Sequence, residues 1–343
     1  MSDKPLILLA IESSCDDTSA AIIKDTTILS NVVAGQEIHR LYGGVVPELA
    51  SRAHQQNIIP VVHAALQKAE VSVDDIDGIA FTKGPGLLGS LVVGTSFAKA
   101  FALAKNIPLI DVNHMQGHVL AHFITNGDQK TPDFPFLCLT ISGGHTQIVL
   151  VTDYLEMKVI GTTIDDAAGE AFDKTAKLLG LPYPGGPLID KYAALGNENT
   201  FTFSKPTLPE YNYSFSGLKT SILYFLQKKE KENPGFVAEN LNDICASVQK
   251  SIIDILFHKL IKASKDLKIN QIAIAGGVSA NSGVRKALNH FANVYKWEIY
   301  IPDFQYCTDN AAMIAIAGHY LFKNQQFADQ SVSATARLSF TKE

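Results

Sequence analysis

Two segments of the chain, 128 residues apart, resemble each other without gaps. Residues 8–23 and 136–151 each contain an apolar run, a few small or polar residues, and a second apolar run. Ser14 aligns with Ser142, and Thr18 aligns with Thr146. Such a pattern predicts a buried strand, a tight turn and a second strand. Two similar hairpins, each near the start of one half, predict two lobes of related fold, with chance similarity as the alternative.

Strand and helix patterns alternate through the rest of the chain. We expect strands at 78–82, 109–112 and 272–275, and helices at 49–68, 88–104, 165–179 and 244–267. This alternation predicts an α/β fold with a mostly parallel core in each lobe. Residues 200–216 are expected to form an irregular loop, and the charged residues 228–235 a second loop.

The composition limits the classes of function. The 343 residues are 46% hydrophobic and 18% charged, which is enough apolar material for two cores. The net charge of −5 gives no overall basic field, so contact with nucleic acid requires a local patch or partner proteins. Four cysteines without a C-x-x-C pair indicate a reduced protein. With neither a signal peptide nor an apolar span of membrane length, we expect a cytoplasmic protein without a membrane segment.

Two histidines, His114 and His118, stand four residues apart. On a helix this spacing places both rings on one face, with Cβ atoms about 5–6 Å apart, which suits two ligands of one transition metal. In the metalloprotease motif H-E-x-x-H a glutamate follows the first histidine as general base, but Met115 stands there in this chain. The pair therefore indicates a metal that orients or polarises a substrate, with two unrelated histidines as the alternative. His122 follows His118 at the same four-residue spacing, but the sequence leaves open whether it is a further ligand.

A third ligand is available at the start of an alanine-rich helix. Thr308 or Asp309 is the default N-cap of that helix. Asp309 is equally able to supply an oxygen ligand to a metal held by the histidines.

Glycine-rich turns mark a second kind of site. Residues 84–89 match G-x-G-x-x-G, with Asp111 at the distance of a ribose-binding acid, but Pro85 removes an amide and favours a purely structural turn. Gly143 and Gly144, after Ser142, predict a nest of backbone amides for phosphate oxygens. Glycine pairs at 185–186 and 276–277 lie in the same half, and together the three pairs predict a nucleotide site. Taken alone, Asp173 is predicted to be an exposed residue that forms an ion pair with Lys177.

Seven segments in order resemble those of the universal tRNA threonylcarbamoyladenosine transferase family, formerly called O-sialoglycoprotein endopeptidases. They are residues 12–16, 43–48, 113–118, 142–146, 165–174, 184–187 and 276–281. The Gly-Val-Ser-Ala-Asn sequence at 277–281 resembles the bacterial branch. The resemblance extends from about residue 7 to residue 320.

The resemblance implies an actin-like (ASKHA, ribonuclease H-like) ATPase fold with two lobes, each a mixed sheet flanked by helices. The repeated hairpins would be its two phosphate hairpins. We place the first lobe at residues 1–113, with a C-terminal return at 317–343, and the second lobe, with insertions, at 114–316.

The resemblance also implies the activity. Members transfer a threonylcarbamoyl group from threonylcarbamoyl-adenylate to the exocyclic amine of the adenosine 3′ of the anticodon, in tRNAs that read codons starting with A. The metal, iron or zinc, would be bound by His114, His118 and Asp309. The donor, and possible ATP or ADP, would be contacted by Thr140, Ile141, Ser142, Gly143, Gly144, Asp173, Gly186, Asp190 and Asn281. Partners would be tRNA, a paralogous actin-like subunit and a small ATPase, with homodimerisation open.

The donor is already an activated anhydride, so no covalent nucleophile is needed. The general base stays open between the metal-bound phosphate and Glu12. Three other functions stay open from the residues alone: a metalloprotease, a small-molecule kinase of the same fold, and a non-catalytic scaffold switched by ATP.

Overall fold

The computed structural model describes residues 4–127, 130–206 and 208–340, and the chain divides into two compact units. The first unit comprises residues 1–132, 153–156 and 302–343, and the second comprises residues 133–152 and 157–301. This division places the His114 segment and residues 302–316 in the first unit, whereas the sequence-based division placed them in the second lobe.

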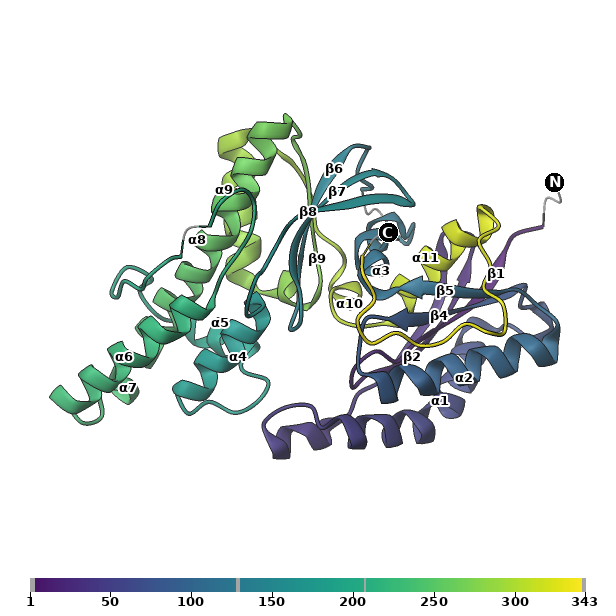
Figure 1. The fold of residues 1–343 in the computed structure, drawn as a ribbon, viewed down its shortest axis with the longest axis horizontal. Helices are drawn as coiled ribbons and strands as arrows, with labels where there is room; N and C mark the ends of the chain where they lie inside the picture. Colours follow the sequence, from purple (N-terminus) through teal and green to yellow (C-terminus); the bar gives the residue numbers. More distant parts are fainter. Residues whose placement is uncertain (1–3, 128–129, 207, 341–343) are drawn as a thin grey trace. The chain divides into compact units, whose positions relative to one another are not determined.

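The first unit is built on a five-stranded mixed sheet of order β3-β2-β1-β4-β5 (Figure 1). Strands β1, β2 and β3 pair antiparallel, while β4 and β5 are added parallel to β1. Their bounds are Ile7–Glu12, Thr18–Lys24, Thr27–Ala34, Gly78–Gly84 and Leu109–Asn113.

The second unit repeats this plan with the order β8-β7-β6-β9-β10. Strands β6 and β7 are antiparallel, β8 lies beside β7, and β9 and β10 are added parallel to β6. The bounds are Phe136–Ile141, Thr146–Asp153, Glu156–Thr162, Gln271–Ala275 and Glu298–Tyr300. Since both sheets have the same strand order, the structure confirms two lobes of related fold, each begun by the repeated hairpin.

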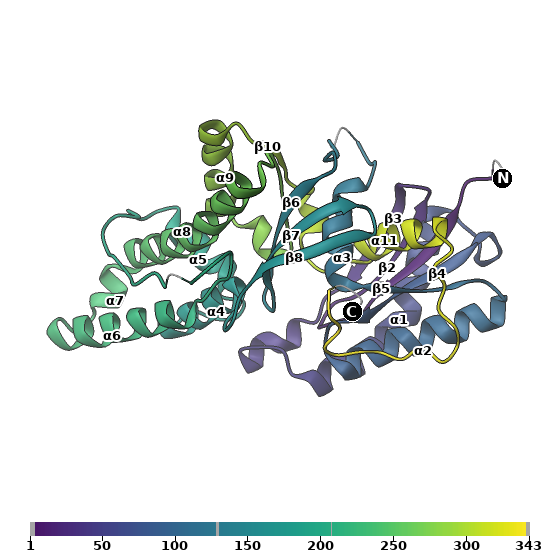
Figure 2. The ribbon, with the colours of Figure 1, turned by 45° about the horizontal axis from the view of Figure 1, so that its top comes forward.

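Helices cover both faces of the first sheet (Figure 2). Alternate residues of β1 face opposite layers: Leu9 and Ile11 share a core with α1 and α2, whereas Leu8 lies on the side of α11, near Gly318. The helices are α1 (Pro47–Ala69), α2 (Leu88–Lys105), α3 (His114–Leu120), α10 (Phe304–Cys307) and α11 (Ala311–Lys323), with 3-10 turns η1 (Glu37–Tyr42), η2 (Val73–Asp75) and η3 (Ala121–Phe123). Helix α2 has the length and apolarity of a marginal membrane span, but it forms one layer of this core.

The core of the second unit is centred on helix α8, whose buried residues include Ile244, Ile252 and Leu256. Its helices are α4 (Ala168–Leu178), α5 (Gly186–Ala193), α6 (Ser216–Glu232), α7 (Phe236–Glu239), α8 (Leu241–Leu267), η4 (Gly277–Ala280) and α9 (Ser282–Tyr295).

The expected loop at 200–216 is confirmed for residues 200–206 and 208–215, while residue 207 lies outside the described residues and Ser216 begins α6. The expected loop at 228–235 is wrong over most of its length. Helix α6 continues to Glu232 because its charged residues form a solvated face. Lys229 lies 3.0 Å from Glu232, and Leu218 and Ile222 bury the opposite face.

The C-terminal segment after α11 runs along the first unit and ends beside α3 (yellow in Figure 1). The amide of Ala328 donates to the Leu109 carbonyl at 2.8 Å, and that of Thr335 donates to the Lys83 carbonyl at 2.8 Å. The side chains of Asn113 and Gln116 donate to the carbonyls of Ser339 and Phe340 at 2.9 and 3.0 Å. The start of α3 is therefore attached to residues 339 and 340.

Candidate functional site

Three polar side chains meet at one edge of the first sheet. Because β1, β4 and β5 are parallel, their carboxyl ends lie at the same edge. Glu12 is the last residue of β1, Thr82 lies near the end of β4, and His114 follows β5 directly. The topology therefore places the first predicted metal ligand next to two polar residues from neighbouring strands.

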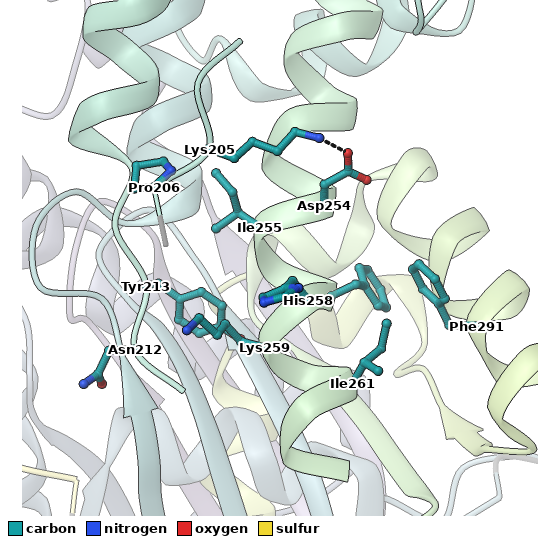
Figure 3. A pocket seen from close by; sticks show the side chains of 11 residues that line it. Lys205, Pro206, Asn212, Tyr213, Asp254, Ile255, His258, Lys259, Ile261 and Phe291 are labelled. Atoms are coloured by element: carbon teal, nitrogen blue, oxygen red, sulfur yellow. Dashed lines mark hydrogen bonds and ion pairs between the residues drawn. The ribbon is translucent and has the colours of Figure 1, made fainter. Parts of the chain in front are cut away.

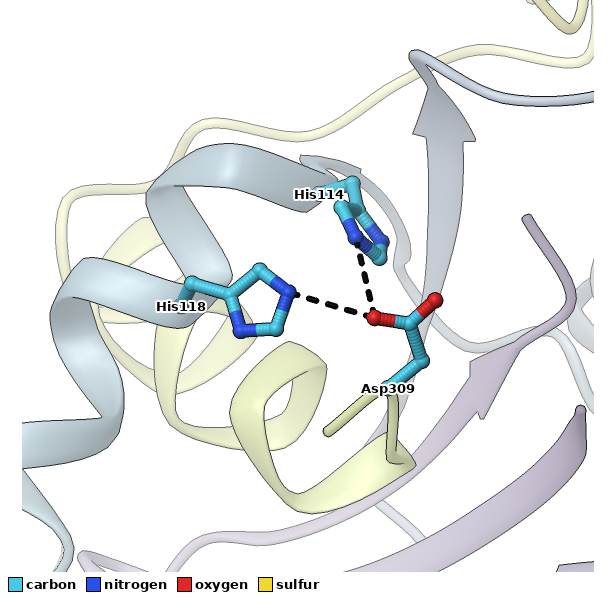
Figure 4. A group of neighbouring side chains, drawn as sticks. All are labelled: His114, His118 and Asp309. Atoms are coloured by element: carbon cyan, nitrogen blue, oxygen red, sulfur yellow. Dashed lines mark ion pairs between the residues drawn. The ribbon is translucent and has the colours of Figure 1, made fainter. Parts of the chain in front are cut away.

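The two histidines lie on one face of α3, as the spacing predicted (Figure 4). Their ring centroids are 4.8 Å apart and the ring planes are nearly perpendicular, at 86°. The Nε2 atoms of His114 and His118 lie 3.5 and 3.3 Å from the same oxygen, Oδ1 of Asp309. One potential ligand atom from each residue lies within 4.8 Å of the other two.

The local sequence explains how Asp309 becomes available. The expectation that Thr308 or Asp309 caps α11 is wrong, since Asn310 is the N-cap and its Oδ1 accepts the amide of Met313 at 3.1 Å. The carboxylate of Asp309 is therefore left to face the histidines.

A glycine allows α3 and α11 to lie close together. A Cβ atom on Gly117 would stand 3.2 Å from both the Met313 carbonyl oxygen and Cδ1 of Ile314. Gly117 lies between the two histidines in the chain, so this close contact holds both of them near Asp309.

The three side chains fit a bound cation better than they fit one another. His118 is 1% exposed, yet neither ring nitrogen makes a hydrogen bond of acceptable geometry with any described residue. A buried polar atom without a partner is costly, and two histidines with one carboxylate form a common zinc or iron donor set.

The electrostatics support the same conclusion. Burial alone lowers the pKa of His114, but the carboxylates of Glu12 and Asp309 outweigh burial and raise this pKa to about 10. Burial opposes ionisation of Asp309 as well, yet the two histidines hold its pKa well below the usual range. Burial keeps the pKa of His118 below its usual value, which favours the neutral imidazole that metals bind. The centre thus stabilises one positive charge between two carboxylates.

Two neighbours of the pair take no part in this group. His122 is buried on η3 and is not among the described residues that cluster as potential metal ligands. Met115, at the position of the protease glutamate, is 2% exposed and belongs to the core.

In the second unit, two glycine-rich loops leave the same edge of the sheet. Strands β6 and β9 are parallel with Thr140 opposite Ala275, so residues 142–145 and 276–281 begin side by side. Thr140 is fully buried and its hydroxyl faces the Gln147 carbonyl at 3.4 Å, which leaves only its backbone for a ligand. Ile141 is buried too, whereas Gly143 and Gly144 are exposed, and among the described residues their amides donate no hydrogen bond.

The predicted polar contacts of the second unit also order its loops. Asp173 does not pair with Lys177 in the described contacts, because its Oδ1 accepts the amides of Gly185 and Gly186 at 2.8 and 2.9 Å. Burial raises the pKa of Asp173 despite these two bonds. Gly185 and Gly186 lie at the start of α5, so Asp173, on α4, shapes the turn that leads into α5.

Asp190 and Asn281 connect the same region to α9. Asp190 accepts the amide and the hydroxyl of Ser282 at 2.9 and 2.7 Å. Asn281 caps α9 through Val284 at 2.9 Å, and its amide donates to Gln249 at 2.8 Å. The second unit thus contains all the predicted nucleotide-contacting residues, in strand β6, in the turns that follow β6 and β9, and in helices α4 and α5.

The G-x-G-x-x-G segment is a structural turn. A Cβ atom on Gly84 would stand 2.0 Å from the Thr335 carbonyl oxygen, and one on Gly86 would stand 2.4 Å from that of Ser14. The chain itself fills the space that a dinucleotide would need, which favours the structural interpretation.

A cavity of about 400 Å³ in the second unit lies apart from these residues (Figure 3). Lys205 and Asp254 at its rim form an ion pair, and the Lys259 ammonium group donates to the carbonyls of Leu208 and Glu210. Its charged groups are thus already paired.

Sequence reasoning missed the residues that support the site. Thr82 lies in a buried strand, where no sequence pattern distinguishes it from a core residue. Gln249 lies on a helix 32 residues before its partner Asn281, too far for a local pattern to predict the contact. Asn310 was detectable, because asparagine is among the best N-caps.

A model of the family described as tRNA N6-adenosine threonylcarbamoyltransferase matches residues 27–316. The chain belongs to this family. The tRNA N6-adenosine threonylcarbamoyltransferase of Christiangramia forsetii is 61% identical over 99% of this chain and 100% of its own length. That of Riemerella anatipestifer is 62% identical over 97% of this chain and 98% of its own length, and that of Thermosipho africanus is 49% identical over 97% and 99%.

Solved structures show the fold. Full-length HypF, in its phosphate- and nucleotide-bound form, matches 94% of this chain and 47% of its own with a TM-score of 0.66 at 13% identity. Component A of the (R)-2-hydroxyglutaryl-CoA dehydratase of Acidaminococcus fermentans matches 93% of this chain and 98% of its own, with a TM-score of 0.53 at 16% identity. The two-lobed, actin-like ATPase fold is therefore confirmed.

Proposed function

We propose that this protein transfers the threonylcarbamoyl group from threonylcarbamoyl-adenylate to the exocyclic amine of the adenosine 3′ of the anticodon, in tRNAs that read codons starting with A. The observation that carries the proposal is the near-full-length relationship to threonylcarbamoyltransferases at 61% identity. Membership of this family argues against the protease, kinase and scaffold alternatives.

We propose that His114, His118 and Asp309 bind one iron or zinc ion. Their three converging ligand atoms support this assignment, as do the buried nitrogens of His118, which make no hydrogen bond of acceptable geometry with a described residue. A bound divalent ion would supply Lewis-acid polarisation to a carbonyl or phosphate oxygen of the donor. Since the side chain of Asp309 is 31% exposed, that of His114 is 9% exposed and that of His118 is enclosed, the ligand set is most open to solvent on the carboxylate side.

The second unit would bind the adenylate. The free amides of Gly143 and Gly144 suit phosphate oxygens, which are held in proteins by successive backbone N–H groups. Loops 185–186 and 276–281, fixed by Asp173 and Asp190, would receive the adenine and ribose. Ordered loops of this kind lower the entropy lost when the donor binds.

The chain has little covalent chemistry to perform, because the donor anhydride is already activated. An adenine amine is a weak nucleophile, so the main contributions are orientation of the amine and stabilisation of charge on the carbamoyl oxygen. The acidic chain, with a net charge of −5, would bind tRNA together with a paralogous actin-like subunit and a small ATPase in the cytoplasm.

The test is reconstitution of the transfer. Purified full-length protein, synthetic threonylcarbamoyl-adenylate, unmodified tRNA and the partner proteins are combined, and modified adenosine is measured after tRNA digestion. We expect His114→Ala and Asp309→Ala to lose at least about 10- to 100-fold in rate, because even the loss of an outer partner of a metal ligand costs this much elsewhere. His258→Ala, a histidine exposed on α8, is the matched control and should retain the wild-type rate. Wild-type activity in both ligand variants would refute the metal assignment, and no transfer by the wild type would refute the activity.

A further inference from the structure

Glu12 is a fully buried carboxylate whose position the metal ligands alone do not explain. It is 0% exposed at the end of β1. Its Oε1 accepts the Ser14 amide at 2.5 Å. Its Oε2 lies 2.5 Å from the Thr82 hydroxyl and 3.0 Å from Nδ1 of His114. Both oxygens are thus engaged by neighbouring groups, and neither reaches the surface.

The contact with His114 determines which ring nitrogen carries hydrogen. An ionised carboxylate only accepts hydrogen bonds, so the nitrogen that faces Glu12 must be protonated. That nitrogen is Nδ1, and the opposite atom, Nε2, faces Asp309 and His118 (Figure 4). In the neutral ring, a hydrogen on Nδ1 leaves the lone pair of Nε2 for a metal.

A second group also lies near Nδ1 of His114. The hydroxyl of Ser14 is 3.2 Å from it. A hydroxyl can donate or accept, so Ser14 is compatible with either tautomer and cannot select one. Glu12 can select one, because it has no hydrogen to give.

We propose that Glu12 is a positioning residue for the metal centre: it holds the hydrogen of His114 on Nδ1 and thereby directs the Nε2 lone pair at the metal. This proposal rests on the proposed metal site. It also gives Glu12 a role other than the general base considered from the sequence, because an enclosed carboxylate with both oxygens engaged does not reach an adenine amine. Thr82 and the Ser14 amide fix the orientation of the carboxylate in turn.

The substitution Glu12→Gln tests this role most directly. Glutamine matches glutamate in shape, but only one end of its amide accepts hydrogen bonds. If the amide oxygen faces the Ser14 amide, the NH₂ group faces Nδ1 of His114 and favours the tautomer with hydrogen on Nε2. If the amide is reversed, its NH₂ group faces the Ser14 N–H. Either arrangement weakens the site, although the protein keeps its volume and its fold.

The first experiment measures zinc affinity of the full-length protein by competition with a chromophoric chelator. We expect Glu12→Gln to weaken zinc binding about 10- to 100-fold, the usual effect of a lost outer partner of a ligating histidine. Ser14→Ala removes only the neutral neighbour and should change the affinity less than about 3-fold. Circular dichroism checks that each variant is folded. An affinity change in Ser14→Ala that equals or exceeds that in Glu12→Gln would overturn the proposal.

The second experiment needs no substitution at Glu12. Protein labelled with ¹⁵N-histidine is loaded with zinc, and the His114 signals are assigned by their loss in His114→Gln. We expect hydrogen on Nδ1 and zinc at Nε2; the reverse pattern would overturn the proposal. If the wild type binds no zinc and no iron, the metal assignment itself fails. If the wild type binds zinc as tightly as folded Glu12→Gln, only the role of Glu12 fails.

Discussion

His319 makes the stability of the first unit sensitive to acid. It lies on α11, the helix that follows Asp309, and is 6% exposed. Burial, with help from the Lys323 charge, lowers its pKa from 6.5 to about 4. The folded protein therefore resists protonation of this ring, while the unfolded chain accepts the proton at the ordinary pKa.

The sign and size of the effect follow from linkage. Between pH 6.5 and pH 4 the unfolded state binds more protons, so the free energy of unfolding falls as the pH falls through this window. Above pH 6.5 the ring is neutral in both states and the term vanishes. The difference in pKa gives a loss of about 2 kcal/mol at pH 5 and about 3 kcal/mol at pH 4.

Urea unfolding at pH 8, 7, 6 and 5 measures this loss in the wild type and in His319→Gln, whose side chain does not titrate. The difference between the two proteins should change by about 2 kcal/mol from pH 8 to pH 5. Trp297, the single tryptophan, lies in the second unit, so its fluorescence reports on that unit, whereas circular dichroism reports on the helices of both units. His63→Gln, at an exposed histidine of α1, is the control. Parallel pH profiles for wild type and His319→Gln would refute the reasoning.

Three further predictions concern the site. Asn310→Ala removes the N-cap of α11 and should lower the free energy of unfolding by about 1 kcal/mol, as measured by thermal unfolding. It should also weaken zinc binding, because the backbone of Asp309 is then less firmly held; unchanged zinc affinity would count against this role. Gly276 has a φ of +86°, and a Cβ atom there would stand 2.5 Å from the Ile141 carbonyl oxygen. Gly276→Ala should therefore lower the free energy of unfolding of the second unit by at least about 1–2 kcal/mol, as followed by Trp297 fluorescence. A neutral effect would contradict the observed turn. Binding of tRNA to the chain alone should be weak at about 0.15 M salt and should strengthen when partner proteins are added, measured by fluorescence anisotropy; tight binding without partners would contradict this expectation.

The sequence predicted the repeated features of the fold better than the local ones. The hairpin repeat predicted two related lobes because apolar strands and small turns are encoded over a few adjacent residues. Helix α6 was not predicted, and its charged end from residue 228 onward was expected to be a loop, because a run of lysines and glutamates is equally typical of a loop and of a solvated helix face. Only the buried positions Leu218 and Ile222, seen in three dimensions, distinguish the two.

The site shows the same division. The spacing of His114 and His118 specified a shared helix face, because that relation is local. The contact of Glu12 with His114 joins residues 102 positions apart and depends on parallel strands ending at one edge, which no local pattern encodes. The resemblance to a known family supplied Asp309 as a ligand, and the structure explains the choice through the Asn310 cap.

The first unit is built from both the N-terminal and the C-terminal part of the chain. This arrangement determines which unit can be completed first during synthesis on the ribosome. His118 and Asp309 are 191 residues apart in sequence, and the whole second unit is synthesised between them. At about 5–20 residues per second, the two histidines wait roughly 10–40 s for their carboxylate. The second unit has its full sequence earlier and can fold first. A chain that stops before residue 309 therefore lacks the complete set of proposed ligands, so uptake of the proposed metal would distinguish finished molecules from interrupted ones.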